Sequence, residues 1–251
     1  MSAPIDFALA GRVGRRFAPD GPDLTLLQAR SVVTELRDHA QEAREHVHAI
    51  TGMEAAPGHP AVVVDRGDWI DSNVAAMGEV LSLWPAALQR HEESSNAAQA
   101  IGPRASAVQI GAALGWLSGK VLGQYEALAD PGRLLLVAPT IVDIERLLEV
   151  EPRDFRLWVC LHEETHRVQF GAVPWLDQHF RDLIARALQT FDETSSGERF
   201  LAIVGEVFDS IIKRRPPDLL TAAQTPAQRA VLDEITGLMS VLEGHADVVM
   251  D

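Results

Sequence analysis

Hydrophobic residues recur with a helical period along most of the chain. The clearest example lies near the C-terminus, where an apolar stripe follows a helix-start signal at residues 225–228, a capping box with a proline in the first turn. The stripe comprises Ile235, Met239, Leu242, Ala246 and Val249. The pattern predicts helices at residues 24–51, 68–93, 103–128, 142–148, 152–170, 175–192, 197–214 and 226–249.

Two short runs depart from this helical period. Residues 61–65 (AVVVD) and 133–138 (RLLLVA) are β-branched or leucine-rich and are bounded by proline or glycine, which predicts strands. The breaks between the predicted elements are too short for interdomain linkers. We therefore expect one domain over residues 1–251, mainly α with a small β element.

The most apolar stretch, residues 105–123, carries a glycine at every fourth position from Gly111 to Gly123. On a helix these glycines would strip one face of side chains. Such a face suits either a membrane dimer or a soluble helix that lies very close to another backbone. Because Lys120 interrupts the stretch and no uncharged run of 18 residues exists, the second interpretation is favoured.

Composition narrows the class of protein. With 47% hydrophobic and 23% charged residues, the chain has the profile of a globular protein, and its formal net charge is −14. Such an acidic surface disfavours nucleic acid and anionic membranes as partners. One cysteine, Cys160, excludes an internal disulfide, and the first ten residues lack the pattern of a secretory signal. We expect a cytoplasmic protein, and the scarcity of lysine relative to arginine indicates a GC-rich, bacterial genome.

The segment that carries chemistry is residues 152–171, where His162, Glu163 and His166 form an HExxH motif. Pro152 suits the first turn of this helix, and Gly171 suits its end. Histidines four residues apart on a helix can bind one tetrahedral Zn²⁺ ion. Glu163 would stand beside the metal, off the ligand face, as a general base for a zinc-bound water.

The surroundings of the motif argue against a chance match. Residues 157–161 are apolar, so this helix should be buried, and a buried helix with two histidines and two glutamates needs partners for them. The alternative to a metal site is a polar network of core histidines whose hydrogen bonds are satisfied.

A catalytic zinc site needs a third protein ligand, and we rank Glu243 first. Glu243 and Asp247 share a face of the C-terminal helix, and Gly244 leaves room for a close approach of two helices. Glu243 could bind the metal while Asp247 accepts the outer N–H of a ligand histidine. The alternative is an ordinary solvated glutamate and aspartate.

Three rivals for the third ligand remain. His245 points about 200° around the helix from Glu243, and we rank it second. Glu206 lies in an apolar helix close to Asp209 and ranks third. His179 is more typical of an ordinary core or surface residue.

These motifs together resemble the zincin-like metallopeptidase type 2 family. The resemblance is carried by DFRLWVCLHEETHRVQF at residues 154–170, EGHAD at 243–247, GRVGRRFAPDGP at 11–22 and GQYEALADPGRLLLVAPTI at 123–141. It implies a zincin-like fold in which the HExxH helix packs against a C-terminal helix. It also implies zinc bound by His162 and His166, with Glu163 as the catalytic residue.

The family pattern also bears on Glu243, which matches the acidic ligand of glutamate-type zincins, followed four residues on by Asp247. One subgroup of the family is associated with biosynthesis of a deazaflavin coenzyme. Family members continue well past this acidic element, whereas this chain stops at Asp251, so we expect either a short member or a C-terminally truncated chain.

From these observations we expect a zinc metallopeptidase or hydrolase that cleaves a peptide or amide bond. Tyr125, His179 and His245 are candidates for stabilising the oxyanion. Two alternatives stay open: an inactive or accessory binding protein on a zincin scaffold, and a hydrolase of a small amide in coenzyme biosynthesis. An intact Glu163 speaks against the first, because a structural metal site has no need of a base.

Overall fold

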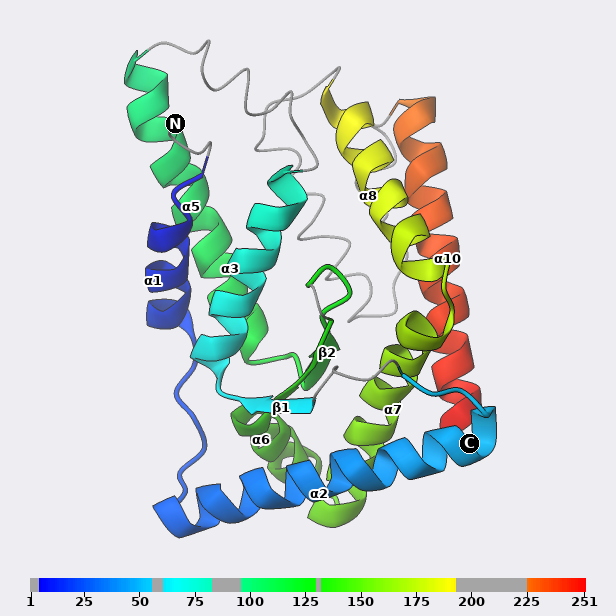
Figure 1. The fold of residues 1–251 in the computed structure, drawn as a ribbon. Coiled ribbons are helices and arrows are strands. Elements are labelled where there is room, and N and C mark those ends of the chain that lie inside the picture. Colours follow the sequence, from blue (N-terminus) through cyan, green and yellow to red (C-terminus); the bar gives the residue numbers. More distant parts are fainter. Residues whose placement is uncertain (1–4, 56–60, 83–95, 130–131, 193–224) are drawn as a thin grey trace.

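The computed structural model describes residues 5–55, 61–82, 96–129, 132–192 and 225–251. The chain is mainly helical with a small three-stranded sheet (Figure 1). Its described helices are α1 (Phe7–Phe17), α2 (Leu26–Thr51), α3 (Arg66–Ser82), α5 (Asn96–Ser118), α6 (Ala138–Leu148), α7 (Pro152–Ala172), α8 (Leu176–Asp192) and α10 (Pro226–Met250). The strands are β1 (Ala61–Val64), β2 (Gly123–Tyr125) and β3 (Leu134–Val137).

The sheet lies at the centre, with β3 between a parallel β1 and an antiparallel β2. Helices α1, α3 and α5 gather on one side of it, α8 and α10 on the other, and the long helix α2 runs across one end (Figure 1). Helix α7 contacts α2, α10 and β2. The HExxH helix is thereby placed between the sheet and the C-terminal helix.

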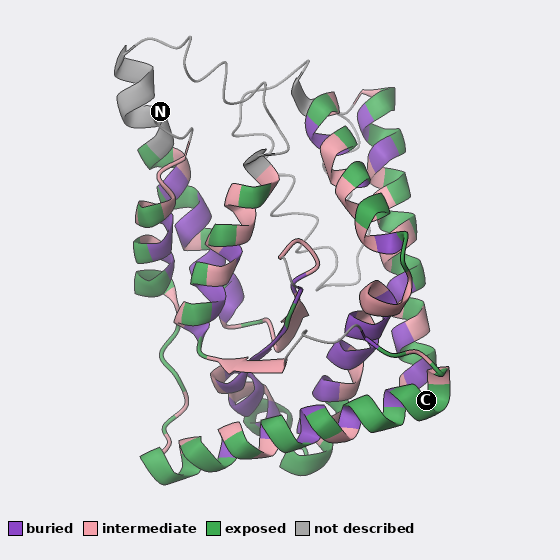
Figure 2. Cartoon of the chain, in the orientation of Figure 1, coloured by how far each residue is buried: buried purple, intermediate pink, exposed green. Residues whose placement is uncertain are grey.

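Strand β3 separates two hydrophobic cores. Successive side chains of a strand point to opposite faces, so Leu136 packs with α2, α6 and α7, while Leu135 and Val137 pack with α1, α3 and α5. All four residues of β3 are buried. Helix α2 covers the first of these cores. Figure 2 shows that its buried positions follow one side of the helix and that its other side is exposed.

The glycine face of α5 lies against the backbone of α1, as predicted for a helix that approaches another closely. A Cβ atom at Gly115 would lie 2.7 Å from the carbonyl oxygen of Gly14, and one at Gly111 would collide with the carbonyl oxygen of Ala10. Only glycine permits this approach. None of the described helices has the length and hydropathy needed to cross a membrane.

The structure corrects several predicted boundaries. The helix predicted at residues 103–128 begins at Asn96 and ends at Ser118, so Gly119 and Gly123 lie outside it, and Gly123 opens strand β2. Helix α6 begins four residues earlier than predicted, at Ala138. Helix α1 was not predicted at all. The predicted helix at residues 197–214 and the end of the one at 68–93 lie outside the described residues.

Candidate metal centre

Helix α7 begins as its sequence predicts. Pro152 lies in the first turn, and the carboxylate of Glu151 accepts hydrogen bonds from the backbone N–H groups of Arg153 and Asp154. The helix continues through Gly171 and ends at Ala172, two residues after the predicted end at residue 170. On its inner face, Val159 and Cys160 pack into the hydrophobic core formed with α2, α6 and Leu136. Burial raises the pKa of the Cys160 thiol to about 12, which is consistent with a packing role.

Helix α10 is held in place at its N-terminus and again along its second half. The predicted capping box is present, because Thr225 and Gln228 exchange hydrogen bonds between side chain and backbone. The Gln228 amide also donates to the carbonyl oxygen of Thr190 at the end of α8. Further along, the buried side chains of Leu242 and Ala246 pack α10 against its neighbours. This packing brings Glu243 close to His162 and His166 on α7.

Three side chains from α7 and α10 converge there. The Nε2 atoms of His162 and His166 are 3.1 Å apart, and they lie 3.6 and 3.5 Å from the carboxylate oxygens of Glu243. Among the described residues, these three form the group of donors close enough to share one ion. All three side chains are partly exposed, so an ion bound here would remain accessible to a small molecule.

The spacing of the three donors fits zinc. Ligand atoms 2.0–2.2 Å from a tetrahedral ion lie about 3.3–3.6 Å from one another. The three observed separations are within a few tenths of an ångström of that range. Two imidazoles and one carboxylate are also a donor set that zinc accepts in catalytic sites. The residues present therefore fit the metal.

Glu163 is buried beside this group, between α7 and β2. A Cβ atom at Gly123 would lie 2.6 Å from Cγ and 2.8 Å from Cδ of Glu163, so the glycine in β2 makes room for this side chain. Burial, and secondarily the charge of Glu243, raises the pKa of Glu163 to about 8. A cation at the three donors would oppose this shift. Without a cation the Glu163 carboxyl group is therefore mostly protonated at neutral pH, and a bound cation would favour the ionised form that can accept a proton.

The second glutamate of the motif has a structural partner. The carboxylate of Glu164 is almost fully buried and accepts hydrogen bonds from Nε and Nη2 of Arg167, at 2.6 and 2.5 Å. Burial raises the pKa of Glu164, against the lowering effect of Arg167. This ion pair supplies the partner that a buried glutamate on this helix requires.

The outer nitrogen of His166 is bound by a residue that the sequence analysis missed. Nδ1 of His166 lies 2.9 Å from Oε1 of Gln169, a buried amide three residues further along α7. The Gln169 amide nitrogen lies 2.9 Å from Nδ1 of His245. His245 therefore stands behind His166, on the side away from the three donors. The spacing of three residues on one helix face was a signal that could have identified Gln169.

The other predicted residues are not members of the group of three donors found among the described residues. Asp247 is exposed on α10, and at His166 the outer-nitrogen role expected of it belongs to Gln169. His179 packs against the ring of Trp175, and Tyr125 against Phe170. Glu206 lies outside the described residues.

An aromatic side chain, that of Trp158, lies next to His162. Trp158, one helical turn before His162, stacks on its imidazole with ring centroids 6.0 Å apart and an interplanar angle of 20°. It also stacks on Phe155 and remains 46% exposed. This ring limits the directions in which the His162 imidazole can turn.

Comparisons with known proteins show the family to which this chain belongs. A family model described as zincin-like metallopeptidase matches residues 5–251. The chain belongs to the zincin-like metallopeptidase family. Its fold is similar to a crystal structure described as "a putative hydrolase with a novel fold" from Chloroflexus aurantiacus, with a TM-score of 0.66 and 27% sequence identity. The match covers 98% of this chain and 68% of the other. No curated protein sequence matches.

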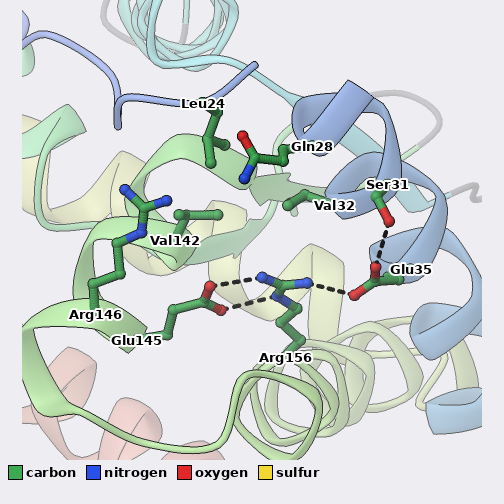
Figure 3. A pocket seen from close by; sticks show the side chains of 9 residues that line it. All are labelled: Leu24, Gln28, Ser31, Val32, Glu35, Val142, Glu145, Arg146 and Arg156. Atoms are coloured by element: carbon green, nitrogen blue, oxygen red, sulfur yellow. Dashed lines mark hydrogen bonds and ion pairs between the residues drawn. The ribbon is translucent and has the colours of Figure 1, made fainter. Parts of the chain in front are cut away.

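This zincin-like protein also has a cavity of about 240 Å³ between α2, α6 and α7, away from the three donors (Figure 3). Its floor is an ion-pair network in which the guanidinium of Arg156 donates two hydrogen bonds to Glu145 and one to Glu35. Ser31 donates to the other oxygen of Glu35. Because these charges are already paired with one another, we interpret the cavity as part of the packing interface between α2, α6 and α7.

The Glu145→Ala substitution is expected to destabilise the fold by about 3 kcal/mol, because it leaves the buried Arg156 guanidinium without its two-pronged partner. Glu35→Ala is the matched control and should have a smaller effect, since the Glu35 side chain is 43% exposed. Chemical denaturation of both variants measures the difference. An equal loss of unfolding free energy would show that the Glu145 pair is not the dominant one.

Proposed function

We propose that this protein is a zinc-dependent hydrolase of peptide or amide bonds. The observation that carries the proposal is the convergence of His162, His166 and Glu243, with the buried carboxylate of Glu163 adjacent. The family and the hydrolase description of its structural neighbour support the same reaction class.

Each residue would have a distinct task. His162, His166 and Glu243 would hold the metal, and zinc, when bound, supplies a Lewis acid that polarises a carbonyl group and lowers the pKa of water. Glu163 accepts a proton from the attacking water and later delivers it to the leaving amine. Gly123 keeps the space in which this carboxylate sits.

The placement of Glu163 favours catalysis over a purely structural metal. A carboxylate whose pKa is raised by burial reduces folding stability at neutral pH, so a site that only stabilised the fold would gain nothing from it. The three donors are also partly exposed, whereas structural zinc sites are closed by a fourth protein ligand.

Metal content and hydrolysis together test the proposal. Protein purified without chelators is expected to contain about one zinc per chain and to cleave a fluorogenic peptide mixture. Removal of the metal with 1,10-phenanthroline should abolish cleavage, and added zinc should restore it. His162→Ala is the control for the site. Absence of bound zinc after zinc is added back would reject the proposal, and zinc binding without cleavage of peptides or of small amides would indicate a binding protein.

A further inference from the structure

We infer that Gln169 is a positioning residue that sets the tautomer of His166 and ties α10 to α7 beside Glu243. The inference rests on the proposed function for its purpose, since it concerns the preparation of the metal site. Its evidence is a set of three hydrogen-bond contacts made by one buried amide.

The orientation of the Gln169 amide follows from its backbone contact. The amide nitrogen lies 2.9 Å from the carbonyl oxygen of Leu242, which can only accept a hydrogen bond. The reverse orientation would set two oxygens against each other in a site where the side chain has almost no access to water. Oε1 of Gln169 must therefore face Nδ1 of His166, at 2.9 Å.

The proton positions on the histidines then follow. Because Oε1 of Gln169 has no hydrogen to donate, Nδ1 of His166 carries the ring proton. In the neutral ring this leaves a lone pair on Nε2, the atom that faces His162 and Glu243 and that a cation requires. The second hydrogen of the Gln169 amide points to Nδ1 of His245, so that nitrogen accepts.

The same amide also positions the third donor. Leu242, which accepts its hydrogen bond, immediately precedes Glu243 and is itself buried. The contact fixes the backbone of α10 against α7 at the point where the Glu243 side chain leaves it. One side chain thus controls a ring on one helix and the placement of a carboxylate on the other.

Two variants separate this role from simple packing. Gln169→Met fills the same volume but removes all three hydrogen bonds, whereas Gln169→Glu keeps an acceptor for Nδ1 of His166 in either protonation state. We expect Gln169→Met to weaken zinc binding by about 10–100-fold, as for other residues that orient a ligand histidine. Gln169→Glu should lose less. Competition with a chromophoric zinc chelator measures both, and circular dichroism confirms the fold.

The decisive readout uses metal-free protein and compares wild type with Gln169→Met. Ring ¹⁵N chemical shifts of His166 should show the Nδ1–H tautomer in wild type and a mixture of tautomers in Gln169→Met. An Nε2–H ring in the wild-type protein, or equal zinc affinities for the two variants, would overturn the inference. Because the tautomer is read without zinc or substrate, this result is independent of whether the protein proves to be a zinc hydrolase.

Discussion

The Glu163→Gln substitution is expected to lower the rate of hydrolysis by about 10²–10⁴-fold while zinc remains bound, because general acid–base catalysis contributes on that scale. Glutamine has the same shape as glutamate and fits the space beside Gly123, but its amide cannot accept the proton of water. The three donors on α7 and α10 are unchanged in this variant. Zinc content by elemental analysis and turnover of a cleaved peptide measure the two effects separately.

The same variant has a consequence for stability. The pKa of Glu163 in the metal-free fold is about 8, above its ordinary value near 4.5. Between these two values the folded chain keeps a proton that the unfolded chain has released, so Glu163 makes the fold less stable as the pH rises through this window. Metal-free Glu163→Gln lacks this loss, so its free energy of unfolding should rise relative to that of the wild-type protein between pH 5 and pH 8.

A rate of hydrolysis equal to that of the wild-type protein would show that Glu163 has no part in the mechanism.

Loss of the Glu243 carboxylate is expected to weaken zinc binding by more than the ~100-fold that marks the upper end for residues outside the ligand set. Glu243→Ala removes one of three donors, and the two histidines on one helix cannot replace it. The measurement is zinc affinity by chelator competition, with the fold checked by circular dichroism.

Asp247→Ala is the matched control on the same helix. Asp247 is exposed, and the outer nitrogen of His166 is bound by Gln169, so we expect its removal to leave zinc affinity nearly unchanged. A loss of about 10–100-fold would instead assign Asp247 the orienting role expected from the sequence.

If Glu243→Ala binds zinc as tightly as the wild-type protein does, the third ligand is another residue, and Glu206 would be the next residue to substitute.

The parts of the site that could be predicted are those encoded by helical spacing. His162 and His166 share a face because they are four residues apart, and Glu243 lies beside an apolar stripe that docks its helix. Local periodicity does not reveal which residue of one helix meets the backbone of another. The contacts of Gln169 with α10 were missed for that reason, since Leu242 and His245 lie more than seventy residues further along the chain, whereas its contact with His166 spans only three residues.

The same limit explains the errors in the fold. Helix α1 contains two glycines in eleven residues, which weakens its local helical signal, and it is held by packing against the glycine face of α5. Strand β2 has only three residues in a segment that continues an apolar helical pattern. It becomes a strand because its backbone pairs with β3, and no local pattern specifies that pairing.

The separation of the three donors along the chain has a consequence for the order of assembly. His162 and His166 come together as soon as α7 forms, but Glu243 arrives only when a segment about eighty residues away has folded and docked. Closing a loop of that length is entropically unfavourable until the final contacts form. After α7 has been synthesised, a nascent chain therefore offers a metal ion only the two imidazoles of these three donors until α10 is made. Tight zinc binding by the proposed site would therefore follow the docking of α10, and zinc uptake would report on completion of the fold.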